Sequence, residues 1–185
     1  MQVESFSFAN FKIMILPSTM VKDTAAVTSV TDLINSVFAI SEAGLLKQNA
    51  TRTTYLEVQQ FISIEQILAV WHGNNLIGVV RYSLLDNKKA QFGMLAVSNS
   101  YQGKGLGKHL VKLSEQLASK DGRNIMEIEV LRAVSQNEPS KEFLRIWYEG
   151  LGYHLVGSKS VDAHYPQYLP LLAKQCVLDI YQKAI

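Results

Sequence analysis

The sequence predicts an α/β (α+β) fold in which helices flank a mixed, mostly antiparallel sheet. Apolar runs at 67–71, 76–84 and 91–97 are separated only by short polar turns, which is typical of an antiparallel meander. An amphipathic segment follows at 106–117, and another apolar run begins after it at 125–130. Because a helix crosses over between the last two strands, they are predicted to run parallel.

The N-terminal part is predicted to supply one more strand and two helices. Residues 11–16 form an apolar run that Pro17 ends, because proline lacks the N–H donor of a continuing strand. From Asp23 to about Gly44, a helix is expected, with apolar residues at helical spacing at Val27, Val30, Ile34, Val37 and Phe38. A shorter helix is expected over 53–61.

The C-terminal part is predicted to add one helix and two strands. Pro139 suits the first turn of a helix, and Gly150 is placed to end it. Apolar runs at 153–156 and 177–181 are the predicted strands. The segment between them, 158–174, is expected to be a surface loop.

Composition predicts one compact domain over residues 1–185, because 48% of the residues are hydrophobic and 18% charged, and no repeat or linker divides the chain. The net charge of +2 is too small to favour a nucleic-acid partner. The lone Cys176 excludes an internal disulfide and fits a reducing compartment. No apolar stretch of membrane-spanning length and no signal peptide is expected. We therefore expect a cytoplasmic protein with no membrane partner.

A glycine-rich turn over 102–107 joins the predicted strand 91–97 to the helix 106–117. Its glycines let the main chain approach a ligand closely, because no Cβ stands in the way. Unpaired amides at the helix start favour an anion, and three lysines are spaced by four: Lys104, Lys108 and Lys112. The turn predicts a phosphate or pyrophosphate site, although a glycine turn can also simply let a helix pack on a strand. Its spacing excludes the Walker loop and the Gly-x-Gly-x-x-Gly dinucleotide fingerprint.

The spacing that fits, Gln-x-x-Gly-x-Gly at 102–107, resembles motif A of the GNAT superfamily of acyl-CoA-dependent N-acyltransferases. The resemblance continues in 93–102 and 125–130, and Trp147–Tyr153 resembles motif B of the same superfamily. It implies the GNAT fold, in which two parallel strands, here 91–97 and 125–130, splay apart to admit acetyl-CoA as co-substrate. The residues then expected to hold acetyl-CoA are Leu95, Ala96, Val97, Gln102, Gly103, Lys104, Gly105, Leu106, Gly107 and Lys108.

The resemblance further implies an N-acetyltransferase in which a primary amine attacks acetyl-CoA directly within a ternary complex, with no metal. Tyr148 stands at the tyrosine position of motif B, where it would protonate the leaving thiolate. A phenol is protonated at neutral pH and can donate. The alternative is a tyrosine packed in the core with its hydroxyl satisfied.

Two carboxylates, Glu127 and Glu129, are candidates for the general base. Strand alternation places both on one face of 125–130, and the segment around Glu129 resembles that of ribosomal-protein N-terminal acetyltransferases. Alternatively, one or both form ion pairs with nearby arginines or face solvent. Two positions depart from the family pattern: Gln91 stands where histone-type members have a glutamate base, and Lys141 stands where many members have an asparagine.

The acceptor is expected to be a small-molecule or peptide amine, and the resemblance implies that acceptor specificity comes from the loops 41–54 and 158–174. The side chains that these loops offer include Glu42, Arg52, His164 and Tyr165. The oligomeric state is expected to be a monomer or homodimer. Two alternatives remain: a catalytically silent GNAT-like module that binds coenzyme A as a sensor or scaffold, and a glycine-turn protein that binds another phosphate ligand.

Overall fold

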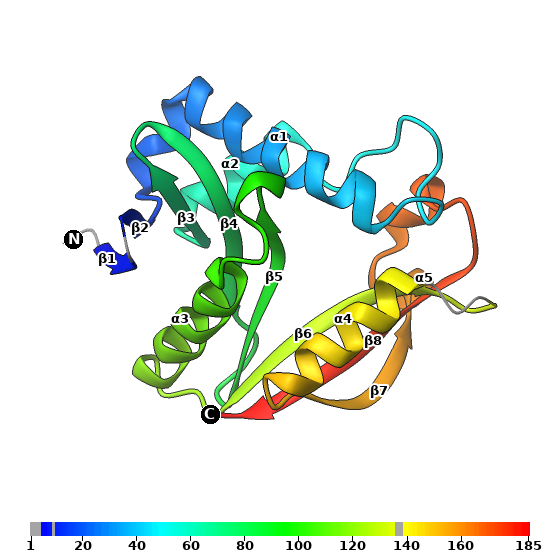
Figure 1. The fold of residues 1–185 in the computed structure, drawn as a ribbon. Coiled ribbons are helices and arrows are strands. Elements are labelled where there is room, and N and C mark those ends of the chain that lie inside the picture. The colour runs from blue at the N-terminus through cyan, green and yellow to red at the C-terminus, as the bar shows by residue number, and fades with distance from the viewer. Residues whose placement is uncertain (1–4, 9, 136–138) are drawn as a thin grey trace.

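The computed structural model describes residues 5–8, 10–135 and 139–185. Within them, eight strands form one sheet in the order β1-β2-β3-β4-β5-β6-β8-β7 (Figure 1). The strands are β1 Ser5–Phe8, β2 Phe11–Ile15, β3 Ile67–His72, β4 Asn75–Leu84, β5 Lys89–Val97, β6 Ile125–Ala133, β7 His154–Ser160 and β8 Cys176–Ala184. Every neighbouring pair is antiparallel except β5 and β6, which are parallel. The predicted mixed, mostly antiparallel sheet is confirmed.

Helices cover both faces of this sheet. The helices are α1 Thr24–Ser41, α2 Tyr55–Ser63, α3 Leu106–Lys120, α4 Pro139–Gly150 and the short α5 Val161–His164, with 3₁₀ turns η1 Ser18–Lys22, η2 Asn99–Tyr101 and η3 Pro166–Leu171. One core cluster packs α1 and α2 on β3, β4 and β5, through residues such as Val30, Val58 and Val79. A second packs α3 and α4 on the other face, through Leu110, Tyr148 and Phe92. Burial of these apolar faces is the main driving force for the assembly.

The helices of the first layer start where the sequence supplies capping groups. The Asp23 carboxylate accepts a hydrogen bond of 3.0 Å from the Ala26 amide at the start of α1. Thr54 and Glu57 form a reciprocal capping box at the start of α2. By length and composition alone, α1 is long and apolar enough to cross a membrane, contrary to our expectation. Core helices of soluble proteins share this length and composition, and the buried residues of α1 pack on the sheet.

Strands β5 and β6 pair only at one end and then separate. Their parallel register covers three pairs, Lys89–Ile125, Ala90–Met126 and Gln91–Glu127. Beyond these pairs β5 stays with β4, and β6 stays with β8 as far as Ala133. A positive φ of 50° at Met94 and a register shift between Val79 and Arg81 mark a β-bulge, which bends β5. Figure 1 shows the two strands diverging, so the predicted splayed pair is confirmed.

The segment 158–174, expected to be a surface loop, is partly ordered structure. It holds the end of β7, α5 and η3. Leu172 forms an isolated β-bridge with Leu46, and Lys47 Nζ donates to the Pro170 carbonyl at 2.8 Å. Val161 and Leu172 are buried in a third core cluster together with Leu45. The expectation was wrong because this segment is ordered by contacts with residues more than a hundred positions away, which local sequence does not reveal.

Candidate functional site

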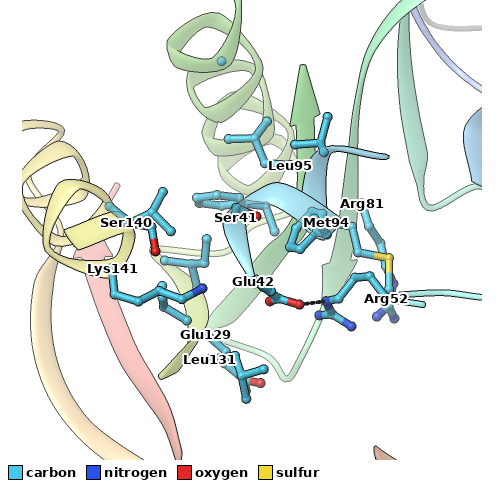
Figure 2. Close-up of a pocket in the computed structure, with 18 of the residues that line it drawn as sticks. Ser41, Glu42, Arg52, Arg81, Met94, Leu95, Glu129, Leu131, Ser140 and Lys141 are labelled. Carbon is cyan, nitrogen blue, oxygen red and sulfur yellow. Dashed lines mark ion pairs between the residues drawn. The ribbon is translucent and has the colours of Figure 1, made fainter. Parts of the chain in front are cut away.

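The divergence of β5 and β6 opens a cavity of about 800 Å³. One end lies at the glycine turn, where Gly103, Gly105 and Gly107 line the cavity. The other end lies under the end of α1 and the loop that follows it, where the lining includes Glu42 and Arg52. Figure 2 shows that α4 contributes Ser140 and Lys141 on one side while Arg81 stands on the other. A cavity of this size is within the range of small-molecule and cofactor sites.

The glycine turn presents open main chain at the start of α3. Gly103 and Gly105 have φ values of 73° and 82°, a left-handed conformation that strains other residues. Gly105 is the residue before the helix, and its carbonyl accepts the amide of His109 at 3.0 Å. Apart from the adjacent residues and the backbone of the helix itself, no heavy atom of a described residue lies within 4 Å of where a Cβ would stand at either glycine. The first amides of α3 therefore face space that an anion can enter.

Gln102 holds this turn in place. Its side-chain amide donates hydrogen bonds to the Val97 carbonyl at 2.9 Å and to Asn99 Oδ1 at 3.1 Å. The carboxamide thus ties the turn to the end of β5. Of the two lysines expected at the site, Lys108 lines the cavity, and Lys104 Nζ lies 5.0 Å from the centroid of the Tyr101 ring. Leu106 also lines the cavity and packs into the core beneath the turn.

The wall formed by β5 exposes part of the predicted acyl-CoA segment. Met94, Leu95 and Val97 line the cavity. Ala96 does not; its side chain is fully buried in the core under α1 and α2. Strand alternation turns the Ala96 side chain away from the face of Leu95 and Val97. Met94, at the β-bulge, belongs to the same core cluster as Ala96 and also lines the cavity.

Tyr148 lies on α4, and its ring is buried among Phe92, Tyr153 and Tyr181. It also lines the cavity. None of the described residues makes a hydrogen bond to its hydroxyl. The structure therefore differs from the alternative in which Tyr148 is a core tyrosine with a hydrogen-bonded hydroxyl. Burial raises the pKa of Tyr148 above its ordinary value, because an apolar surrounding disfavours the phenolate. The group is therefore a proton donor at neutral pH.

The two candidate bases occupy different surroundings. Glu129 lines the cavity, where it accepts a hydrogen bond of 2.9 Å from the Tyr165 hydroxyl and forms an ion pair with Lys159. Glu127 lies at the closed end of the strand pair and is not among the lining residues. Its Oε2 accepts from Gln182 Nε2 at 2.7 Å and lies 3.9 Å from Lys89 Nζ. Of the two candidate bases, only Glu129 lines the cavity.

At the end of the cavity under α1, where the acceptor is expected and which we call the acceptor end, Glu42 is buried and faces Arg52. Glu42 Oε2 and Arg52 Nε are 3.8 Å apart, and neither atom has a hydrogen-bond partner among the described residues. The Arg52 guanidinium lies over the rings of Phe38 and Tyr168, at 5.4 and 5.7 Å from the centroids. Tyr165 also lines this end. His164 does not line the cavity; it is exposed on α5 and its Nδ1 lies 3.2 Å from the Ser160 carbonyl.

Sequence reasoning missed one charged residue of the cavity, Arg81. It lies in the middle of β4 and lines the cavity beside Ser83 and Gly93. The signal was present, because a lone arginine interrupts an otherwise apolar run from 76 to 84. Gln91 and Lys141, the two departures from the family pattern, also line the cavity. Among the described residues, no three histidine, cysteine, aspartate or glutamate side chains gather into a group that could hold a metal ion.

Comparison with known proteins agrees with this architecture. An aminoglycoside 6'-N-acetyltransferase complexed with coenzyme A superposes with a TM-score of 0.63 at 15% identity, over 100% of this chain and 97% of that one. The protein yncA of Salmonella typhimurium, solved with acetyl-CoA, gives 0.63 at 14% identity over 95% and 94%. A GNAT family acetyltransferase from Elizabethkingia anophelis with acetyl-CoA bound gives 0.54 at 14% identity, over 76% and 95%. These likenesses show the fold.

No curated protein matches the sequence at a significant level. The model of the acetyltransferase (GNAT) family matches residues 37–147. That range is more than half of the chain and includes the glycine turn, both splayed strands and most of α4. The chain therefore belongs to the GNAT family of acetyltransferases.

Proposed function

We propose that the protein transfers the acetyl group of acetyl-CoA to a primary amine by direct attack within a ternary complex. The observation that carries this proposal is the single cavity that runs from the glycine turn, between the splayed strands, to Glu129 and Tyr148. A co-substrate with a diphosphate at one end and a thioester at the other fits a cavity with that order of groups.

The glycine turn would hold the diphosphate. The first amides of α3 and the positive end of its dipole favour negative charge, and Lys108 adds a cation at the cavity wall. The pantetheine arm would lie along β5, whose backbone groups near Leu95 and Val97 are no longer paired with β6 at this level. A main-chain amide there would stabilise the oxyanion that forms on the thioester carbonyl.

Two side chains would move the protons. Glu129, directly or through a water molecule, would take a proton from the acceptor's ammonium group, so that the neutral amine can attack the thioester carbon. When the tetrahedral intermediate collapses, the carbon–sulfur bond breaks and Tyr148 would protonate the departing thiolate. The nitrogen then still carries one proton more than the amide product, and it gives this proton to water, from which the phenolate of Tyr148 is reprotonated. The amide product and coenzyme A leave, and Glu129 releases the first proton to solvent.

The test is release of free thiol from acetyl-CoA with a panel of amino acids, peptides, polyamines and aminoglycosides, with the acetylated product identified by mass spectrometry. We expect at least one amine to raise thiol release above the rate without acceptor. Calorimetry with coenzyme A, run alongside, separates the alternatives. Coenzyme A binding with no thiol release for any amine would favour the sensor module. A larger rise in Tm with ATP than with coenzyme A would contradict the assignment of the glycine turn to coenzyme A.

A further inference from the structure

Among the described residues, the two carboxylates that line the acceptor end of the cavity each face a cation. Glu129 forms an ion pair with Lys159, and Glu42 faces Arg52. Lys141 has a partner of its own. Arg81 also lines the cavity, but no carboxylate of a described residue forms an ion pair with it. The charge of the Glu57 carboxylate acts on Arg81 from a distance, but Glu57 accepts its hydrogen bonds from Thr54 and Tyr168 instead. A partly buried cation with no carboxylate in contact is costly, so this end of the cavity favours an anion.

Arg81 is held in a fixed orientation by two contacts. Its Nε donates a hydrogen bond of 2.9 Å to Gln66 Oε1, and its guanidinium carbon lies 4.1 Å from the centroid of the Phe61 ring. Its two outer nitrogens make no hydrogen bond to a described residue. The guanidinium therefore presents an oriented pair of N–H donors, the geometry that binds a carboxylate through two parallel hydrogen bonds.

Space for a ligand group lies next to Arg81. In the register of β4 and β5, Arg81 is opposite Gly93, which has no side chain. Gly93 lines the cavity, and within the part of the chain that the structure describes, no heavy atom beyond its two chain neighbours lies within 4 Å of where its Cβ would stand. Cross-strand neighbours normally fill this space; here it is open beside the guanidinium.

The anion would lie close to the reacting atoms. Gly93 is two residues before Leu95, near which the thioester carbonyl would be held, and two residues of strand span roughly 7 Å. Glu129, the proposed base, lines the same cavity. A molecule with a carboxylate at Arg81 could therefore reach the thioester with an amine only a few bonds away.

We propose that Arg81 binds a carboxylate of the acceptor, so that the substrates are small amines that also carry a carboxylate, such as amino acids, in preference to polycationic amines. This inference rests on the proposed function, because it names the substrate class of the same site. Arg81, which lines the acceptor end without an ion pair to a described residue, would repel a second ammonium group, which works against polyamines and aminoglycosides.

The first experiment compares each acid with its own amide. The panel contains the standard amino acids, β-alanine and γ-aminobutyrate, each paired with its primary amide, which keeps the amine and removes the negative charge. We expect kcat/KM of the best free acid to exceed that of its amide at least about tenfold. Arg81→Gln should bring this ratio close to one, whereas Arg81→Lys, which keeps the charge and loses the paired donors, should give an intermediate ratio. The Kd of acetyl-CoA should stay within about twofold of wild type.

Arg145→Gln is the matched control, because Arg145 is an exposed arginine on α4 that does not line the cavity. It should keep the wild-type ratio. Equal rates for acid and amide in the wild type, or an unchanged ratio in Arg81→Gln, would overturn the proposal. If Arg81→Gln does not fold, the acid-to-amide ratio of kcat/KM in the wild type and in Arg81→Lys tests the proposal.

A binding experiment separates this inference from the proposed function. Calorimetry of the protein saturated with coenzyme A, titrated with the N-acetyl derivatives of the same acids and amides, requires no turnover. Preferential binding of the N-acetyl acids, lost in Arg81→Gln, supports the carboxylate site even if no amine is acetylated. If no acid binds, or acids and amides bind alike, the site is absent, and thiol release from the amine panel still tests the acetyltransferase by itself.

Discussion

The hydroxyl of Tyr165 donates a hydrogen bond of 2.9 Å to Glu129 Oε2, which links the loop after β7 to one wall of the cavity. Lys159 forms an ion pair with the same carboxylate. Because both partners come from the chain segment that follows α4, the proposed base is oriented by residues that lie more than 25 positions away in the sequence. The hydrogen bond therefore connects Tyr165, at the acceptor end of the cavity, to Glu129, the proposed general base.

Glu129→Gln should remove the acid-side fall of the pH–rate profile and lower kcat by about a hundredfold, because the amide cannot accept the proton of the amine. The measurement is kcat against pH with the best acceptor. Glu127→Gln is the matched comparison: Glu127 is held by Gln182 and Lys89 outside the cavity, so its loss should keep the shape of the profile. An unchanged profile in Glu129→Gln would place the base elsewhere.

Tyr148→Phe should lower kcat by about a hundredfold while leaving the Kd of acetyl-CoA unchanged, because it removes the proposed proton donor and keeps the packed ring. Tyr153→Phe is the control from the same aromatic cluster. The Tyr153 hydroxyl donates to Glu115 at 2.8 Å, and Tyr153 does not line the cavity. Its loss should cost about 1 kcal/mol of stability with kcat retained. Wild-type kcat in Tyr148→Phe would remove Tyr148 as the acid.

Gly105→Glu should weaken acetyl-CoA binding on the order of a hundredfold, because it places a negative side chain in the space proposed for the diphosphate. Gly73→Glu is the control for backbone strain, because it introduces the same side chain at another glycine with positive φ. Gly73 also has a positive φ, 59°, and among the described residues only its chain neighbours come within 4 Å of a Cβ, but it lies in the hairpin between β3 and β4. Calorimetry should show normal affinity for Gly73→Glu. Equal losses in the two variants would attribute the effect to strain.

Asp179→Asn should destabilise the protein at pH 7 by about 2 kcal/mol, with the loss shrinking in acid. Burial opposes the charged form of Asp179, but hydrogen bonds from Arg132 and Ser158 outweigh it and hold the pKa of this carboxyl below its ordinary value. A lowered pKa in the folded state adds stability above the unfolded pKa of about 4, and that stability is lost as pH falls through the folded pKa.

Urea unfolding at pH 7 and at about pH 2 measures this difference. Asp32→Asn, on the exposed side of α1, removes the same charge and should change stability little at either pH. A penalty for Asp179→Asn that is as large at pH 2 as at pH 7 would mean that the carboxylate charge is not its source.

Local pattern in the sequence predicted the elements that position the site. The alternation of β6, the amphipathic repeat of α3 and the glycines at 103 and 105 are properties of a few neighbouring residues, and the structure has the strand, helix and positive φ values there. The boundaries moved by a few residues, as where β6 continues to Ala133 instead of ending at 130. β1 and α5 were not predicted, because each is only four residues long.

The sequence by itself determined the neighbouring strands β3 to β6, the glycine turn and the family, because strand alternation, helical spacing and glycine conformation act over a few bonds. Only the tertiary structure decided which candidate base reaches the cavity, where the Gln102 amide points and which cavity arginine forms no ion pair with a described residue. Charge pairing and burial depend on residues such as Arg81, Lys159 and Glu42, which come together only when the chain folds.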